Sequence, residues 1–409
     1  MTDKNAGYRS VLAALRSRLA EPAPARLQLL VGPRQVGKTT LLLEITRTAR
    51  HPAIYVNADT PEASLPTWAD AMWREAEEKA SRGVTFLLID EIQALPRWSQ
   101  WLKARHDQVR RKKLPLHVVA TGSSSLRIGS GARESMAGRF ERLVLTHWGA
   151  RDLIDLVKVP AAEAAEMIVT HGGYPGAVPF WNARERWRSY LRDAIIEPAI
   201  GRDLLQLEQV RRPALLKQVF ALAAAHPAEI LSLEKIAGSL AEKGALETIA
   251  HYLELLKEAF LVANLQKYAG DEIRRRRSPP KLVVLNNALL AGSRSAPPPT
   301  ASSNPVEWGR WLENACLAHL VNSGQELHYW REEPWEVDGV STGSWGQWLV
   351  EVKSGPFGQS DLRGLAQAAL KFPAFKPVVL CDPGREDIAR SAGFTARSWP
   401  DFLLTGLAG

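Results

Sequence analysis

The feature that most constrains the fold is a short segment near the amino terminus, Gly32-Pro33-Arg34-Gln35-Val36-Gly37-Lys38-Thr39. It matches GxxxxGK[ST] at every fixed position, and it follows an apolar run, Leu27–Val31. Glycines allow successive backbone N–H groups to curl around a phosphate, and a helix that begins at the loop adds its positive amino-terminal end. The segment therefore predicts a strand, a phosphate-binding loop and a helix, in that order.

Within this loop, two side chains have distinct expected roles. Lys38 is expected to reach the β- and γ-phosphates of a nucleotide, and Thr39 to place its hydroxyl on Mg²⁺. We therefore expect ATP and Mg²⁺ as cofactors. The residues expected to bind the nucleotide are Gly32, Pro33, Arg34, Gln35, Val36, Gly37, Lys38, Thr39 and Thr40.

Two carboxylates follow a second apolar strand, Phe86–Ile89. Asp90 is placed to act on the metal, and Glu91 is placed to take a proton from an attacking water. A solvated acidic turn is the alternative, but a complete phosphate loop upstream favours the catalytic interpretation. Further along, Val118–Ser125 reads as a strand that ends in small polar residues, and such a strand end could aim a hydroxyl at the γ-phosphate. Arg133 and Arg139 follow, and either could neutralise charge in the transition state, although a lone arginine is also a common surface residue.

These segments resemble the AAA+ ATPase superfamily, in the prokaryotic branch close to the archaeal-type and signal-transduction ATPases. The matching stretches are GPRQVGKTT, LLIDEIQ, ATGSSS and Ala137-Gly138-Arg139-Phe140. The resemblance implies that Ser123 is the sensor and that Arg139 acts near the γ-phosphate, either in its own subunit or in a neighbour. It continues through Gly172–Pro175, and such ATPases are commonly fused to a carboxyl-terminal domain of uncertain role.

Alternating strands and helices predict an α/β protein whose first domain has a mostly parallel sheet covered on both faces. A helical stretch follows, and then a helix, a turn at Gly244, a second helix (Glu247–Glu258) and a strand, which is the order of a winged helix. The final stretch predicts a small α/β domain. The expected divisions are an ATPase domain at 1–148, a helical lid at 149–230, a winged-helix-like region at 231–278, a connecting segment and linker at 279–305, and a nuclease-like domain at 306–409.

The last of these regions carries a second group of acidic residues. Glu351 and Lys353 are two positions apart on a strand, so they share one face. Asp338 lies on the preceding strand, and a hairpin would bring it beside Glu351. Asp338 and Glu351 are expected to bind Mg²⁺, with Lys353 orienting or activating a water, and Glu313 could add a third carboxylate.

This spacing resembles the PD-(D/E)xK nuclease superfamily, on Asp338, Glu351-Val352-Lys353, Glu313 and Gln367. One departure is that Val337 stands where the family has its proline. The resemblance implies catalytic roles for Asp338, Glu351 and Lys353. Three interpretations stay open: an active nuclease, a nuclease-like fold without activity, and an unrelated fold with an ordinary Glu–Lys pair.

Composition bounds the partners. Lys and Arg total 52 against 44 Asp and Glu, giving a net charge of +8, which permits an anionic partner such as DNA. The run Arg274–Arg277 either binds phosphates or is a solvated loop. The two cysteines, Cys316 and Cys381, form no ligand cluster, so we expect buried free thiols, no structural zinc and a reducing compartment. The apolar runs are too short for a membrane span, and we expect a cytoplasmic protein.

The leading hypothesis is a Mg²⁺-dependent AAA+ ATPase that couples its nucleotide state to DNA binding or cleavage by the carboxyl-terminal region. One alternative is a nucleotide switch that binds a protein partner, with a catalytically inert carboxyl-terminal domain. Another is a DNA-binding regulator in which that domain is structural. Association with further copies of the chain stays open.

Overall fold

The computed structural model describes residues 7–122, 138–204, 210–240, 245–269 and 278–407. The chain divides into two compact units, Met1–Thr146 and His147–Gly409, each of which is described by itself. This division lies close to the boundary predicted at residue 148. The other predicted boundaries fall inside the second unit.

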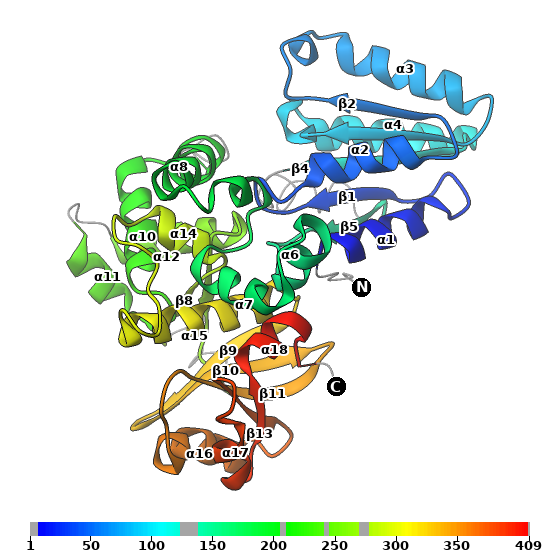
Figure 1. Ribbon diagram of the computed structural model, residues 1–409. Helices are drawn as coiled ribbons and strands as arrows, with labels where there is room; N and C mark the ends of the chain where they lie inside the picture. Colours follow the sequence, from blue (N-terminus) through cyan, green and yellow to red (C-terminus); the bar gives the residue numbers. More distant parts are fainter. Residues whose placement is uncertain (1–6, 123–137, 205–209, 241–244, 270–277, 408–409) are drawn as a thin grey trace. The chain divides into compact units, whose positions relative to one another are not determined.

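The first unit is a single parallel sheet with helices on both faces (Figure 1). Its strands are all parallel and have the order β2-β3-β4-β1-β5. Its elements are α1 (Tyr8–Leu19), β1 (Leu27–Val31), α2 (Lys38–Thr48), β2 (Ala53–Asn57), α3 (Trp68–Ala80), β3 (Thr85–Asp90), α4 (Trp98–Lys112), β4 (Leu116–Gly122) and β5 (Phe140–Val144).

The central strands of this sheet are buried on both faces, which is why they read as continuous apolar runs. Every residue of β1, β3 and β4 is buried. Helices α2 and α4 lie on opposite sides of the sheet in Figure 1. Trp73 on α3 and Leu102 on α4 belong to one core cluster with alternate residues of the strands. The predicted α/β fold class is confirmed.

The second unit begins with helices and continues with a small antiparallel sheet of order β6-β8-β7. Helix α10 precedes β6, and α11 and α12 lie between β6 and β7. These elements are α6 (Ala150–Val157), α7 (Ala161–Thr170), α8 (Arg184–Tyr190), α10 (Pro213–Ala225), β6 (Glu229–Ile230), α11 (Leu233–Ser239), α12 (Leu246–Glu258), β7 (Val262–Leu265), β8 (Lys281–Val284) and α14 (Asn287–Gly292).

One sequence-based expectation differs from the structure here. Residues 279–305 were expected to be a connecting segment, but they contain β8, the central strand of the small sheet, and α14. All four residues of β8 are buried, and so are Ala288–Ala291 of α14. The Pro- and Ser-rich composition of residues 293–305 describes only the end of this segment. The small sheet therefore takes its central strand from beyond residue 278.

The carboxyl-terminal part is a mixed sheet of order β13-β12-β11-β10-β9. Strands β9, β10 and β11 are antiparallel, whereas β11, β12 and β13 are parallel. The elements are α15 (Pro305–Asn322), β9 (Glu326–Glu332), β10 (Trp335–Gly343), β11 (Gly346–Lys353), α16 (Arg363–Lys371), β12 (Lys376–Cys381), α17 (Glu386–Ser391), β13 (Thr395–Ser398) and α18 (Trp399–Thr405). A register shift interrupts the β9–β10 pairing between Val337 and Val340, so Asp338 lies in a bulge.

Candidate nucleotide-binding site and a second acidic cluster

The phosphate loop leaves the carboxyl end of β1, which is the expected position for a ligand in a parallel sheet. Gly37 has φ +97°, a conformation that favours glycine, and it directly precedes α2. At Gly32, an added Cβ would lie 2.0 Å from the backbone oxygen of Leu145. Both glycines of the motif are therefore required by the backbone, and the loop ends at a helix amino terminus as predicted.

Lys38 is buried within this loop, with 5% of its surface exposed. Its Nζ donates hydrogen bonds to the backbone oxygens of Gly32, at 3.0 Å, and Pro33, at 2.7 Å. The ammonium thus lies inside the loop. There, phosphate oxygens could replace the two carbonyl oxygens as acceptors of its hydrogen bonds.

Asp90 is the last residue of β3, and its carboxylate accepts hydrogen bonds from hydroxyl groups on three different elements. Thr39 on α2 donates to Asp90 Oδ2 at 2.6 Å, and Tyr55 on β2 donates to the same oxygen at 3.1 Å. Thr121, at the end of β4, donates to Oδ1. Burial, together with the charge of Asp90, raises the pKa of Tyr55 to about 12, so the phenol stays a donor at neutral pH.

These residues fit a nucleotide with Mg²⁺. The loop offers backbone curvature and an ammonium for phosphates, while Thr39 and Asp90 supply neighbouring oxygens of the kind that Mg²⁺ prefers. Mg²⁺ usually keeps several waters and takes one or two protein ligands beside the phosphates. Thr39 and Asp90 together match that requirement.

Glu91 follows Asp90 in the left-handed region, with φ +51°. Its backbone N–H donates to Thr121 Oγ1 at 3.1 Å, and its carboxylate accepts from the Gln93 amide. Ser123, the expected sensor, lies outside the described residues. Sequence reasoning missed Tyr55, Thr121 and Gln93; of these, Thr121 could have been found, because it lies in the same ATGSSS stretch.

Arg139 lies at the amino-terminal end of the parallel strands, whereas the phosphate loop lies at their carboxyl-terminal end. Its backbone oxygen accepts from Leu27 N, at the start of β1, whereas the loop follows the last residue of β1. Five residues of strand separate the two edges, or roughly 16 Å. Its guanidinium pairs with Asp107 at 2.7 Å. The arrangement favours action on a neighbouring subunit over action on the phosphate loop of its own subunit, and a role for Arg139 near the γ-phosphate stays a prediction.

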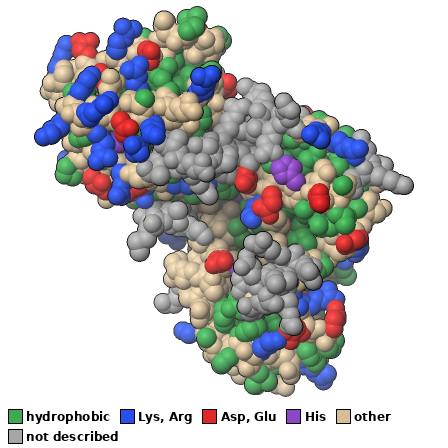
Figure 2. All heavy atoms as spheres, turned by 180° about the vertical axis from the view of Figure 1, so that it is seen from behind, with side chains coloured by type: hydrophobic (Ala, Val, Ile, Leu, Met, Phe, Trp, Pro, Cys, Tyr) green, Lys and Arg blue, Asp and Glu red, His purple; other side chains and the backbone are tan. Residues whose placement is uncertain are grey.

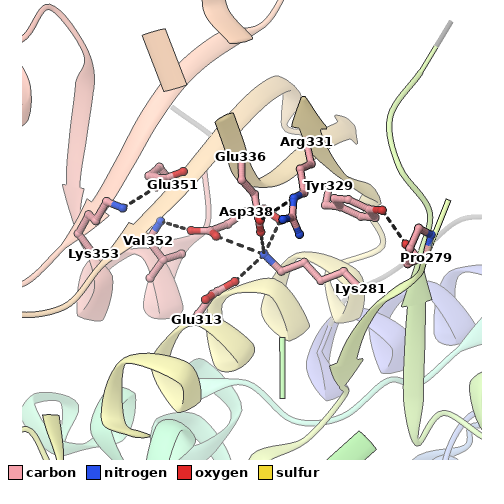
Figure 3. A network of polar contacts seen from close by, with 10 residues as sticks. All are labelled: Pro279, Lys281, Glu313, Tyr329, Arg331, Glu336, Asp338, Glu351, Val352 and Lys353. Atoms are coloured by element: carbon pink, nitrogen blue, oxygen red, sulfur yellow. Dashed lines mark hydrogen bonds and ion pairs between the residues drawn. The ribbon is translucent and has the colours of Figure 1, made fainter. Parts of the chain in front are cut away.

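In the second unit, the expected hairpin brings the predicted acidic residues together (Figure 3). Gly339 pairs with Val350, which places Asp338 next to Glu351 on the neighbouring strand. Asp338 Oδ2 accepts from the Val352 N–H at 2.9 Å. Lys353 and Glu351 share a face, as the strand period requires, and form an ion pair at 2.6 Å.

The sequence did not predict the centre of this cluster, which is Lys281. Its Nζ lies 2.6 Å from Glu313 Oε1, 3.2 Å from Asp338 Oδ1 and 3.4 Å from Glu336 Oε1 (Figure 3). The side chain is 1% exposed. A lysine that opens an otherwise apolar strand, β8, was the only sequence signal. Gln367, the remaining residue of the nuclease resemblance, is exposed on α16.

The charges of this cluster shift one another's pKa values. Burial raises the pKa of Glu351 to about 8, and the neighbouring Asp338 adds to this effect. Burial likewise raises the pKa of Glu313 to about 8, with a further contribution from Asp338. Burial alone would raise the pKa of Asp338, but Lys281 and Lys353 hold it below its usual value. Asp338 is therefore the carboxylate that stays ionised beside the two lysines.

Within the described ranges, no group of three or more His, Cys, Asp or Glu side chains is arranged to hold a metal ion. The predicted Mg²⁺ site at Asp338 and Glu351 thus stays a prediction. Cys316 and Cys381 are buried free thiols, as expected. None of the helices in the described residues combines the length and apolar character needed to cross a membrane.

The sheet order, the phosphate loop and the Thr39–Asp90 pair define the first unit as a P-loop ATPase domain, and the comparisons specify its type. Residues 25–153 match the family model of the AAA domain. The first unit is therefore an AAA-type ATPase domain, which supports nucleotide binding and hydrolysis. Residues 162–298 and 308–402 match two domains of unknown function, DUF8612 and DUF4143.

Two curated relatives are the uncharacterized protein Rv2008c of Mycobacterium tuberculosis and the uncharacterized protein Mb2031c of Mycobacterium bovis. Each is 32% identical over 244 residues, which cover 59% of this chain and 50% of the relative. The match thus spans about half the length of these relatives.

The chain is also similar to a number of solved structures, of which two are described. One is the Aeropyrum pernix ORC1 protein in complex with DNA, at 16% identity, a TM-score of 0.33, and coverage of 69% of this chain and 90% of that chain. The other is the Thermotoga maritima RuvB Holliday junction branch migration motor, at 19% identity, a TM-score of 0.33, and coverage of 63% and 90%. At these scores the two structures do not bear on the function of this chain.

Proposed function

We propose that the chain is a Mg²⁺-dependent ATPase whose nucleotide state controls DNA binding by the second unit. The observation that carries the ATPase half is the 2.6 Å hydrogen bond between Thr39 and Asp90. This bond joins the end of the phosphate loop to the end of β3. It places two oxygen atoms that could bind a metal ion, one from Thr39 and one from Asp90, beside each other. When bound there, Mg²⁺ would neutralise charge that develops on the transferred phosphoryl group.

The remaining steps belong to residues of the chain. Lys38 exchanges the backbone oxygens of Gly32 and Pro33 for phosphate oxygens. Thr121 donates to the Asp90 carboxylate and accepts from the Glu91 backbone N–H, so one hydroxyl positions both residues. Glu91 then leaves the Gln93 amide and accepts the proton of the attacking water.

Topology supports the DNA-binding half. The order α10, β6, α11, α12, β7, β8 with the antiparallel sheet β6-β8-β7 is that of a winged helix, and it supports such a module in residues 213–284. Helix α12 carries Glu254, which pairs with Lys257 at 3.1 Å and accepts from Asn264 at 2.6 Å. Because α12 is acidic, it is poorly suited to contact the edges of DNA bases. We therefore expect contacts to DNA phosphates, which depend little on the DNA sequence.

The first unit adds positive charge. Figure 2 shows Lys and Arg side chains spread over the face of this unit that is turned to the viewer. At the end of α4, four consecutive basic residues, Arg110, Arg111, Lys112 and Lys113, are exposed. We leave DNA cleavage out of the proposal, because the Lys281 ammonium occupies the space between Glu313 and Asp338.

The test uses the purified full chain with ATP and Mg²⁺. Lys38→Ala is expected to remove ATP binding without unfolding the protein. Glu91→Gln is expected to bind ATP and to lower turnover by ~10²–10⁴-fold, because an amide cannot take a proton. Lys79→Ala is the matched control, since Lys79 is exposed and, within the part of the chain that the structure describes, forms an ion pair with Glu75 of the same helix. Normal ATP affinity in a folded Lys38→Ala variant would refute the phosphate-loop assignment.

Glu91→Gln also tests the coupling, because it holds the ATP-bound state. Fluorescence anisotropy of labelled double-stranded DNA should show tighter binding with ATP than without, and the affinity should fall as salt rises. DNA binding that ignores nucleotide would contradict the coupling. Absence of DNA binding in every nucleotide state would favour the alternative, a nucleotide switch that binds a protein partner.

A further inference from the structure

The net positive charge of the chain lies entirely in its first unit. Residues 1–146 contain 23 Lys and Arg against 14 Asp and Glu, whereas in residues 147–409 the acidic residues outnumber the basic ones by one. Overall charge therefore attracts a polyanion to the first unit rather than to the second, for which we propose DNA binding.

The parallel sheet gathers basic residues at its amino-terminal end, where all of its strands begin. A basic residue precedes each strand by one to three positions. In sheet order these residues, which we call the basic row, are Arg50 before β2, Arg82 before β3, Lys113 before β4, Arg26 before β1 and Arg139 before β5. Neighbouring strands lie ~4.8 Å apart, so the row spans roughly 19 Å. The phosphate loop lies at the other end of the same strands, so the row is separate from the nucleotide site.

The end of α4 adds further positive charge to the row. Arg110, Arg111 and Lys112 form the last turn of this helix, directly before Lys113, and all four side chains are exposed. Lys112 pairs with Glu77 at 3.0 Å. Arg110, Arg111 and Lys113 form no ion pair with any described residue. Like charges so close together repel, and a polyanion bound there would relieve the repulsion.

The ion pairs elsewhere in the row are exposed to solvent. Arg82 pairs with Glu78 at 2.7 Å, and both side chains are exposed. Arg26, which is exposed as well, pairs with Glu141 at 2.9 Å. Exposed ion pairs contribute little net free energy, so these guanidinium groups can exchange a carboxylate for a phosphate at small cost.

A recess lies within the row between β1 and α4. A cavity of about 500 Å³ is lined by Arg26 and Arg110, and also by the acidic residues Glu21 and Glu141. Glu141 accepts from Arg26 and lies 3.6 Å from the guanidinium of Arg18, so its charge is balanced. The recess thus offers a phosphate group room beside two guanidinium groups.

The helix macrodipole explains only part of this arrangement. Arg110 and Arg111 lie in the last turn of α4, where a positive charge is favourable in any helix. Arg50 and Arg82 lie two residues beyond the ends of α2 and α3, and Arg26 belongs to the segment that enters β1. Because the dipole effect falls off within the last turn, these three arginines need another reason.

The chemistry of the row favours a nucleic acid over a membrane or a protein. The planar guanidinium of arginine binds phosphate through two parallel hydrogen bonds. Membrane surfaces and protein interfaces require exposed apolar side chains in addition to charge. The large hydrophobic side chains exposed in the described part of the first unit are Leu43, within α2, and Leu65, between β2 and α3. Neither belongs to the segments that enter the strands.

We propose that the basic row, together with the last turn of α4, binds the phosphate backbone of DNA. The inference rests on the DNA binding proposed above and adds to it a contact surface on the first unit. Phosphate contacts carry no information about the bases, so binding at the row depends little on DNA sequence.

The experiment measures the salt dependence of DNA binding by the full chain, with a labelled DNA duplex and fluorescence anisotropy, with and without ATP. Each phosphate contact contributes about 0.9 to the slope of log affinity against log salt concentration. Arg110→Ala/Arg111→Ala should therefore reduce the slope by about 2, and Arg50→Ala, at the far end of the row, should reduce it by about 1.

Arg74→Ala/Lys103→Ala is the matched control. It removes two positive charges from the middle of α3 and α4, away from the segments that enter the strands, and should leave the slope close to that of wild type. Circular dichroism checks that each variant is folded at the assay temperature, and Arg50→Ala tests the row independently of α4.

The outcomes separate this inference from the proposed function. If wild type binds DNA but Arg110→Ala/Arg111→Ala and Arg50→Ala keep its slope, the inference is overturned and the proposed function stands. A control that reduces the slope as much as the row variants also overturns it. Wild type that binds no DNA in any nucleotide state refutes both. Vesicles of phosphatidylserine and phosphatidylcholine form the last arm: binding to vesicles but not to DNA would assign the row to a membrane and overturn the inference.

Discussion

The fully buried amide of Asn314 on α15 offers a quantitative test of how β8, and with it Lys281, is held in place. Its Nδ2 donates to the backbone oxygen of Val284 at 2.7 Å, and its Oδ1 accepts from the Val284 N–H at 2.9 Å. The amide thus pairs with β8 as a neighbouring strand would. Nδ2 also donates to Asn287 Oδ1 at 2.8 Å, which ties α14 to the same point.

We expect Asn314→Leu to destabilise the second unit severely. The substitution roughly keeps the volume but leaves three buried groups without a partner: the Val284 N–H, the Val284 carbonyl and Asn287 Oδ1. Each orphaned group costs ~1–3 kcal/mol, so the free energy of unfolding should fall by at least ~3 kcal/mol. For a unit of this size, that lowers the unfolding midpoint by about 6–12 °C.

Thermal and urea unfolding followed by circular dichroism measure this loss, and amide hydrogen exchange at Val284 locates it. Asn322→Leu on the same helix is the comparison variant, because Asn322 donates to the Leu285 oxygen at 2.9 Å but is only partly buried, so water can replace what the substitution removes. The control should cost ~1 kcal/mol. If Asn314→Leu costs no more than the control, or leaves exchange at Val284 unchanged, the pairing argument is refuted.

Two further predictions concern a charge and a proton. If Arg139 acts on a neighbouring subunit, Arg139→Ala should lower ATP turnover more than ATP binding. Mixing this variant with Lys38→Ala should then restore part of the ATPase activity. A mixture without rescue contradicts a role across an interface. Burial lowers the pKa of His319 to about 4, so the ring is neutral in the fold while the unfolded chain takes up a proton below its ordinary value of 6.5. Stability is therefore lost as pH falls from 6.5 towards 4, by about 2 kcal/mol at pH 5, and His319→Leu should remove this loss in urea unfolding at pH 7 and 5. Equal pH responses of the two proteins would place the titrating group elsewhere.

The nucleotide site could be predicted from the sequence because its main parts are local. The loop and Lys38 are contiguous, and Thr39 follows directly, so spacing alone carries the chemistry. Asp90 joins them because the carboxyl ends of parallel strands meet at one edge. Tyr55 could not be placed in this way, since nothing in its own strand distinguishes a hydroxyl aimed at Asp90 from an ordinary core tyrosine.

Other features depend on pairings that the sequence does not encode locally. Arg139 was placed near the phosphates by resemblance, but the strand that follows it runs parallel to β1 and puts it at the far edge. Lys281 lies in a stretch whose Pro- and Ser-rich end suggested a linker, and its partners come from α15 and β10. Only the three-dimensional arrangement shows that this lysine and these carboxylates meet.

The two acidic sites differ in the groups that balance the negative charge of a buried carboxylate. This difference bears on whether a metal ion could bind at each site. Asp90 is met by neutral hydroxyls from Thr39, Tyr55 and Thr121, so an arriving metal meets no positive charge there. Thr39 can turn its oxygen from donor to ligand without leaving the site. Asp338 is met by the ammonium of Lys281, which has no lone pair to offer and repels a metal at close range. The hydroxyl groups thus leave Asp90 open to the Mg²⁺ that we propose to bind there, whereas the Lys281 ammonium already supplies a positive charge beside Asp338.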